Sequence, residues 1–123
     1  PGIAAAEAPA VYGNALRDDP WLDAWPVTLR DVIPVPSKDG WQVADAHADA
    51  HPGARTGSAL PLAPAALSRP GLWKLVALSG GGPVTVFGEI GHRGFDPYAA
   101  WDPGDPEEGE AAPAAARSVV PLV

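Results

Sequence analysis

The 123-residue sequence contains no cysteine and no methionine. The absence of cysteine excludes disulfides, thiolate metal sites and cysteine nucleophiles. A chain without cysteine is fully compatible with a reducing compartment, and we expect a cytoplasmic location. The absence of methionine extends to position 1, which is proline, so we expect this chain to be a domain of a longer protein.

Positive charge is also scarce. Eight Lys and Arg residues stand against 15 Asp and Glu residues, which gives a net charge of −7. A negative surface repels phosphate backbones and anionic lipid, so the composition argues against nucleic acid as a direct partner. No apolar run approaches the roughly 20 residues that span a bilayer, and we expect no membrane partner.

Large apolar side chains are fewer than the hydrophobic fraction of 46% suggests, because much of that fraction is alanine. The core must rest on five Trp, two Tyr and two Phe residues together with Leu, Val and Ile. Sixteen prolines and fourteen glycines argue against long helices. They favour short strands joined by defined turns.

The most strand-like stretch is Leu72–Glu89, which we interpret as a β-hairpin at the centre of the fold. Trp73–Leu78 is apolar except at Lys74, and Val84–Phe87 is entirely β-branched or aromatic, as in strands buried on both faces. Ser79–Pro83 supplies the glycines for a reversal between them. Helix is the poorer interpretation of Trp73–Leu78.

A second reversal, at Gly91–Gly94, predicts a third short strand at Phe95–Trp101. Before the central stretch, Val27–Pro36 predicts a strand with a bulge near Asp31, where clean alternation ends. A turn at Ser37–Gly40 then leads into a returning strand. The antiparallel β domain is therefore expected over residues 27–101.

The remaining segments of this domain carry weaker signals. The returning strand is Trp41–Asp45, and residues 46–58 are polar and predict an exposed loop. Ala59–Ala63 predicts a short strand that Pro61 restricts to a sheet edge. Pro64–Pro70 predicts a linker or a single helical turn.

Residues 1–26 predict a helical cap. Apolar residues at helical spacing follow Pro9, a suitable first-turn proline, and Pro20 ends this helix. We expect a further helical turn at Trp21–Trp25. Its two tryptophans, four residues apart, are expected to plug one end of the sheet; the alternative is an exposed aromatic platform for a ligand.

The C-terminal part changes in composition. Residues 102–117 are acidic and rich in alanine and proline, which predicts a solvated connector. Residues 118–123 are apolar again and are candidates for a docked edge strand, in the same or another molecule. The whole pattern predicts a mainly β fold of five or six strands, a small antiparallel partly open barrel or SH3-like roll with an N-terminal helical segment. The alternatives are an α+β roll and a two-sheet sandwich.

One segment carries metal-ligand residue types at alternate positions: Asp45, His47, Asp49 and His51. Alternate residues of a strand share a face, and imidazole with carboxylate suits zinc. The same pattern is typical of a polar loop in a sequence rich in Ala and Asp, and no distant ligand is evident. We therefore expect no bound metal and no cofactor.

Catalytic candidates are sparse. Glu89 follows the most apolar strand and is a candidate for a partly buried carboxylate with a shifted pKa, paired with Arg93 or Lys74; the commoner outcome for such a residue is a surface carboxylate at a strand end. His92 belongs to a turn and is expected to be solvated. Gly80–Gly82 precedes a strand instead of a helix, which argues against a phosphate loop. The serines lack the nucleophile-elbow context; they are Ser37, Ser58, Ser68, Ser79 and Ser118. We expect no enzyme activity.

An ordered series of short strings covers about residues 10–101 and resembles the C-terminal region of bacterial SWIM zinc-finger family proteins. The likeness is closest at Ala77–Gly81 and Pro83–Glu89. The other strings are Asp19–Leu22, Trp25–Val27, Leu29–Val32, Pro34, Gly40–Trp41, Leu60–Leu62 and Trp73–Leu75. The family's finger uses cysteines and a histidine. This chain has no cysteine, so the resemblance implies a region downstream of the finger and carries over neither metal nor nucleic-acid binding.

The leading hypothesis is a non-catalytic accessory or protein-interaction domain of a larger SWIM-type protein, with a protein or the rest of the parent chain as partner. Edge strands limited by Pro61 and Pro121 motivate it. A competing hypothesis is a small metal-binding domain or enzyme that uses the Asp45–His51 loop, or a pocket in which Glu89, His92 or Arg93 converges. A third, a nucleic-acid-binding barrel, rests on fold analogy alone.

Overall fold

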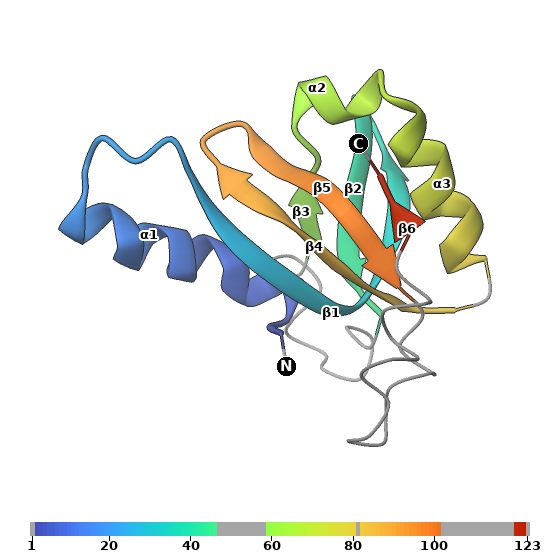
Figure 1. Cartoon of the computed structure of the whole chain (residues 1–123), viewed down its shortest axis with the longest axis horizontal. Coiled ribbons are helices and arrows are strands. Elements are labelled where there is room, and N and C mark those ends of the chain that lie inside the picture. The colour runs from blue at the N-terminus through green and yellow to red at the C-terminus, as the bar shows by residue number, and fades with distance from the viewer. Residues whose placement is uncertain (1, 47–58, 81, 102–119, 123) are drawn as a thin grey trace.

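A computed structural model describes residues 2–46, 59–80, 82–101 and 120–122. Within them, six strands form one antiparallel sheet in the order β3-β2-β1-β4-β5-β6 (Figure 1). The strands are β1 (Ala24–Ser37), β2 (Gly40–Asp45), β3 (Ala59–Pro61), β4 (Val84–Gly91), β5 (Gly94–Trp101) and β6 (Val120–Pro121). The predicted mainly β fold with an N-terminal helical segment is confirmed.

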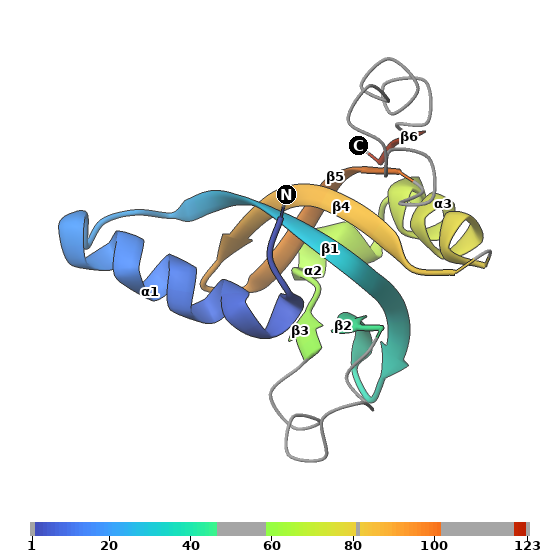
Figure 2. The same cartoon turned by 90° about the horizontal axis from the view of Figure 1, so that it is seen from below.

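Helical segments flank this sheet. They are the 3₁₀ turn η1 (Ala5–Glu7) and the helices α1 (Ala8–Asp18), α2 (Pro64–Leu67) and α3 (Pro70–Ser79). Each α-helix has a proline in its first turn, where the missing N–H is not needed for an intrahelical bond. Figures 1 and 2 show α1 and α3 at opposite ends of the long axis.

The longest strand, β1, joins two parts of the sheet. Its first half pairs with β4 and its second half with β2, and the register shifts between Leu29 and Val32. Asp31 lies at this shift with a φ of 53°, a left-handed conformation that a bulge accommodates. The predicted bulge is confirmed, and Figure 2 shows the strong curvature of β1.

The curved sheet closes on itself over a short distance. Leu62, just after β3, forms a parallel bridge with Phe95, and the Ala63 N–H donates to the Phe95 carbonyl at 2.8 Å. Gly94 makes this approach possible, because its φ is 121° and a Cβ would lie 2.6 Å from the Pro61 carbonyl oxygen. The sheet is therefore a partly open barrel.

The core fills the inside of this barrel. Alternate side chains of β1, β4 and β5 point inward, and α1 and α3 each contribute residues from one face. The largest fully buried side chains are Phe95, Leu29, Leu75, Leu122, Val32, Val43, Val84 and Val86. The expectation that the five tryptophans form the core is wrong: the buried aromatic residues are Phe95 and Tyr12, the rest of the core is aliphatic, and Trp41 is the tryptophan that packs against it from a half-buried position.

The prediction of a strand at Trp73–Leu78 is wrong. This segment lies in α3, with Leu72 and Leu75 buried three residues apart and Trp73 and Lys74 exposed between them. Pro70 starts the helix, and Leu, Trp, Lys and Ala tolerate helical geometry. The expected hairpin at Leu72–Glu89 is therefore a helix followed by β4, whereas the hairpin at Gly91–Gly94 is confirmed.

The predicted helical turn at Trp21–Trp25 is also wrong. The chain turns at Pro20 and Trp21 and enters β1 at Ala24. Trp21 is 90% exposed and Trp25 is 40% exposed, so neither forms the expected plug. Tyr12 and Leu16 of α1 contribute to the core at this end instead.

The C-terminal residues add the short strand β6 to the edge of β5. Ala99 and Ala100 pair with Pro121 and Val120, and the Leu122 N–H donates to the Tyr98 carbonyl at 2.7 Å. Leu122 is buried. Its backbone runs so close to α3 that a Cβ on Gly71 would lie 1.6 Å from the Leu122 carbonyl oxygen.

We predict that Gly71→Ala lowers the free energy of unfolding by roughly 1–3 kcal/mol, because the added methyl group displaces the Leu122 backbone. Chemical denaturation measures this. Gly13→Ala is the matched control, since a Cβ there meets nothing within 4 Å; it is expected to stabilise by up to about 1 kcal/mol. Equal midpoints for Gly71→Ala and the wild-type chain would contradict docking of β6 against α3.

Candidate functional site

The turn between β4 and β5 borders two hollows in the described surface. Gly91 and Gly94 close the hairpin, and His92 and Arg93 stand exposed at its tip. A cleft of about 310 Å³ lies on one side of this turn, and a groove of about 470 Å³ lies on the other. Both hollows are lined by the four residues 91–94, so they form one continuous surface.

The first hollow, here called the acidic cleft, has carboxylates from three strands or strand ends. Asp23 precedes β1, Glu89 lies on β4, and Asp96 lies on β5 directly opposite Glu89. Ala24 pairs with Gly91 across β1 and β4, which brings Asp23 beside the turn. The acidic cleft is therefore a product of the β1–β4–β5 pairing.

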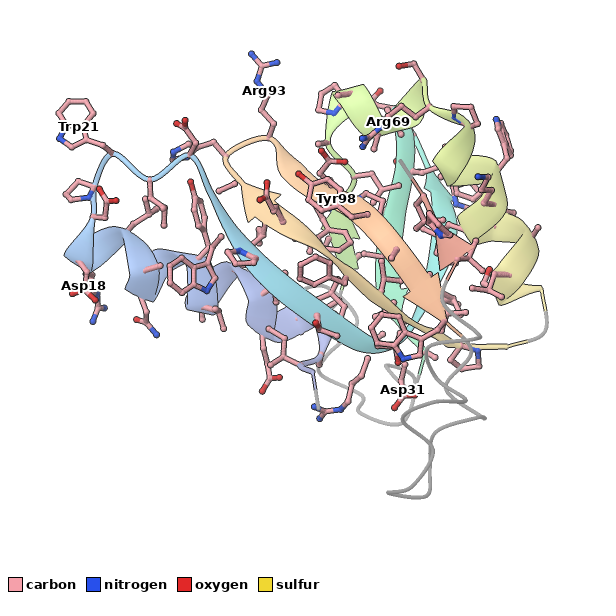
Figure 3. All side chains as sticks on the ribbon, viewed as in Figure 1. Asp18, Trp21, Asp31, Arg69, Arg93 and Tyr98 are labelled. Carbon is pink, nitrogen blue, oxygen red and sulfur yellow. The ribbon has the colours of Figure 1, made fainter. Side chains whose placement is uncertain are left out.

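Two of these carboxylates have partners. Asp96 forms an ion pair with Arg69, which lies between α2 and α3, and Glu89 Oε1 accepts a hydrogen bond from the Tyr98 hydroxyl at 2.8 Å. Within the described residues, no cation pairs with Asp23 or Glu89. Figure 3 shows Arg93 pointing away from the ribbon. Arg93 lines the cleft as well, but the three carboxylates outnumber Arg69 and Arg93, so the cleft keeps net negative charge.

Tyr98 is the titratable residue that this environment changes most clearly. Its hydrogen bond to Glu89 raises the pKa of the Tyr98 phenol, and desolvation and the negative charge of Glu89 raise it further. Arg69 acts weakly in the opposite direction. The Tyr98 ring also packs against Phe87, with centroids 6.3 Å apart, on the outward face of the sheet. Phe87 is 37% exposed there.

The second hollow, here called the apolar groove, lies between α1, β3 and the turn. Tyr12 and Leu16 of α1, Leu60 of β3 and Ile90 of β4 line it. The Tyr12 ring meets the His92 ring edge-on with centroids 5.4 Å apart. The Tyr12 hydroxyl donates to the carbonyl oxygens of Leu22 and Asp23, so one side chain orders both hollows.

Exposed tryptophans flank these hollows. Trp25 lies on β1 opposite Ile90, which lines the apolar groove, and Trp21 lies two residues before Asp23. Figure 3 shows Trp21 projecting into solvent at the end of the molecule where Asp18 also lies, and Arg93 projecting from the β4–β5 turn. Large exposed aromatic side chains around a hollow are typical of protein-contact surfaces.

The structure brings some of the sequence candidates together and separates others. Glu89, His92 and Arg93 do line one hollow, while Lys74 lies on the exposed face of α3 and does not pair with Glu89. The cleft lining contains no hydroxyl or thiol nucleophile. Sequence reasoning missed Asp96, although the register of a hairpin closed by Gly91 and Gly94 places it opposite Glu89.

Asp45, the first candidate ligand of the metal hypothesis, has a structural role. The Asp45 carboxylate accepts hydrogen bonds from the N–H groups of Ala5 and Ala6, at 2.6 and 3.1 Å, and so caps η1. His47, Asp49 and His51 lie outside the described residues. Among the residues that the structure describes, no three His, Asp or Glu side chains are grouped to hold a metal ion.

The glycine-rich segment that begins at Gly80 follows a helix instead of preceding one, because α3 ends at Ser79. The Ser79 hydroxyl donates a hydrogen bond to the Val76 carbonyl. Ser68 likewise donates to the Ala65 carbonyl at the end of α2. Ser37 ends β1 and pairs with Gly40 at the turn into β2. These serines serve local structure, and Ser58 and Ser118 lie outside the described residues.

Comparisons with protein-family models, with curated proteins and with solved structures find no match to this chain. In the part of the chain that the structure describes, no helix combines the length and the apolar character needed to cross a lipid bilayer.

We predict that the alkaline stability of the chain depends on Tyr98. Because its pKa is raised in the folded state, the phenol stays protonated to higher pH than in the unfolded chain. The contribution is fully present below about pH 10, the ordinary tyrosine pKa, and is lost as the pH rises through the Tyr98 pKa. In Glu89→Ala, which removes both the hydrogen-bond acceptor and the negative charge, ultraviolet titration should show the Tyr98 pKa returning toward the ordinary value. Tyr98→Phe identifies the signal, and an unchanged titration in Glu89→Ala would contradict this cause.

We predict that Asp45→Ala lowers the free energy of unfolding by roughly 0.5–2 kcal/mol through loss of the η1 cap. Asp45→Asn keeps one acceptor oxygen and is expected to lose less. Thermal unfolding with and without zinc provides the measurement. A zinc-dependent stabilisation of the wild-type chain that Asp45→Ala abolishes would instead make Asp45 a metal ligand.

Proposed function

We propose that this chain is a non-catalytic accessory domain of a larger SWIM-type protein and that it binds a protein segment at the β4–β5 turn. The observation that carries the proposal is that two hollows share one ordered turn, with the exposed Trp25 on β1 opposite Ile90 of the groove and the exposed Trp21 two residues before Asp23 of the cleft. A tryptophan that is exposed in the free domain contributes much of the binding energy when a partner buries it, because water solvates its large apolar surface poorly. This end of the molecule therefore has the composition of a docking surface.

The negative charge of the acidic cleft favours a positively charged partner. Asp23 and Glu89 line the acidic cleft without a cationic partner among the described residues, and the whole chain carries a net charge of −7. A basic segment is attracted over a distance by this field and finds carboxylates at short range. The proposed partner is an extended protein segment that contains lysine or arginine, from another protein or from the parent chain.

Docking on the turn is favoured over pairing with a sheet edge. The outer edge of β5 is used by Leu62 and Ala63 at its start and by β6 at its end. At the other edge, β3 is short and ends in Pro61, which cannot donate a ladder hydrogen bond. Few backbone groups are left for an added strand.

The resemblance to SWIM-type proteins supports the accessory role. The strings Leu29–Val32, Leu60–Leu62 and Pro83–Glu89 fall largely on β1, β3 and β4, which build the barrel. Asp19–Leu22 and Trp25–Val27 form the chain beside the docking surface. A family likeness in these segments concerns the framework and one of its ends, and it involves no catalytic group.

The Phe87–Tyr98 pair gives the nucleic-acid hypothesis its one specific observation, because exposed aromatic rings on a sheet face stack with bases. Glu89 and Asp96 lie on β4 and β5 beside this pair, and carboxylates repel phosphates. We therefore expect no binding when single-stranded DNA is titrated into the chain. Binding that weakens with rising salt would favour the barrel hypothesis.

We predict that selection of a random twelve-residue peptide library on the full chain enriches peptides that contain Lys or Arg. The double variant Asp23→Asn, Glu89→Gln is expected to bind these peptides at least ten-fold more weakly, because the cleft loses its unpaired carboxylates. Glutamine retains an acceptor for the Tyr98 hydroxyl, so the fold is preserved. Fluorescence anisotropy measures the affinities.

The matched control is Asp18→Asn, Asp39→Asn, which changes the net charge equally at exposed positions outside the cleft. It should leave affinity within about two-fold at physiological salt. Trp21→Ala should weaken binding, while Trp73→Ala, which removes a 61% exposed tryptophan from α3, should not. Selection without basic enrichment, or equal losses in both double variants, would refute the proposed surface.

A further inference from the structure

We propose that the apolar groove binds a large apolar side chain of the same basic segment. The domain then recognises a Lys or Arg together with a neighbouring Leu, Phe or Trp of that segment. This inference rests on the proposed function. It is carried by separate observations: the groove's own lining, the glycine at its wall and its continuity with the acidic cleft.

The groove is built to receive apolar atoms. Tyr12, Leu60 and Ile90 are buried and form its floor, and Leu16 is half-buried at its side. Tyr12 directs its hydroxyl away to the Leu22 and Asp23 carbonyls, so its polar atom is already satisfied. A side chain that enters this hollow replaces water over an apolar surface and needs no hydrogen-bond partner.

Gly13 lines this groove in the middle of α1. Glycine in a helix interior costs about 1 kcal/mol relative to alanine. Its φ is not in the left-handed region, and a Cβ would meet nothing within 4 Å. The packing of α1 therefore does not require glycine at position 13. Its effect is to leave the wall of the groove open.

The two hollows suit one occupant because residues 91–94 line both. A segment that places a cation beside Glu89 and continues across Gly91 reaches Ile90 and Leu16 on the other side. Ile90 follows Glu89 on β4, and alternate strand residues point to opposite faces of the sheet. One face thus presents the carboxylate and the other the apolar surface, with the turn as the crossing point.

The test uses the same twelve-residue library on the wild-type chain and on Gly13→Leu, whose side chain fills the groove. Wild-type selection should enrich a large apolar residue near the Lys or Arg. Selection on Gly13→Leu should keep the basic enrichment and lose the apolar one. The affinity of a wild-type-selected peptide should fall about ten-fold or more in Gly13→Leu. Gly13→Ala should bind it within about two-fold, since a methyl group leaves most of the groove open.

A double-mutant cycle separates the contact from indirect effects. Replacing the peptide's apolar residue by alanine should weaken binding to the wild-type chain and have little further effect on Gly13→Leu. Apolar enrichment or affinity that Gly13→Leu leaves unchanged overturns this inference and leaves the proposed function intact. Absence of basic enrichment on both chains overturns the proposed function itself, so the two failures are distinguishable.

Discussion

The structure depends on the contact that closes the curved sheet, where Leu62 and Ala63 meet Phe95 and Gly94. Without this closure β3 would lie at one edge of an open sheet, separated from β5 by three strands, and Phe95 would not be enclosed. The bulge at Asp31 supplies the bend in β1 that brings these edges together. The same contact fixes the start of β5, and with it the β4–β5 turn that forms the proposed docking surface.

Four carboxylates among the described residues divide into two groups. Asp45 and Asp96 have structural partners. Asp45 caps η1, and Asp96 forms an ion pair with Arg69, which lies between α2 and α3. Asp23 and Glu89 have no cation of their own among the described residues, and Glu89 is merely oriented by Tyr98. Charge left without a local partner costs little at a solvated surface and remains available for an external cation.

The tryptophans show a similar division. Trp41 packs against the core and meets Trp73 edge-on, with centroids 6.0 Å apart, whereas Trp21 and Trp25 face solvent beside the turn. The barrel interior is filled by Phe95, Tyr12 and aliphatic side chains, and none of the tryptophans is fully buried in it. In the proposed function, Trp21 and Trp25 become contact residues, whereas Trp73 on α3 does not.

The sequence by itself determined the features that depend on neighbouring residues. The β1–β2 and β4–β5 hairpins, the bulge at Asp31 and the helix that begins around Pro9 follow from turn residues, alternation and proline geometry, which act locally. The hairpin closed by Gly91 and Gly94 already implied that Glu89 lies opposite Asp96. Only the tertiary structure decided that the apolar run Trp73–Leu78 is a helix, because a short apolar run suits either geometry and the buried face it finds selects one. It also decided that Trp21 is exposed and that Asp23 joins Glu89 in one cleft, since both depend on how far the sheet curves and on which chain ends meet there.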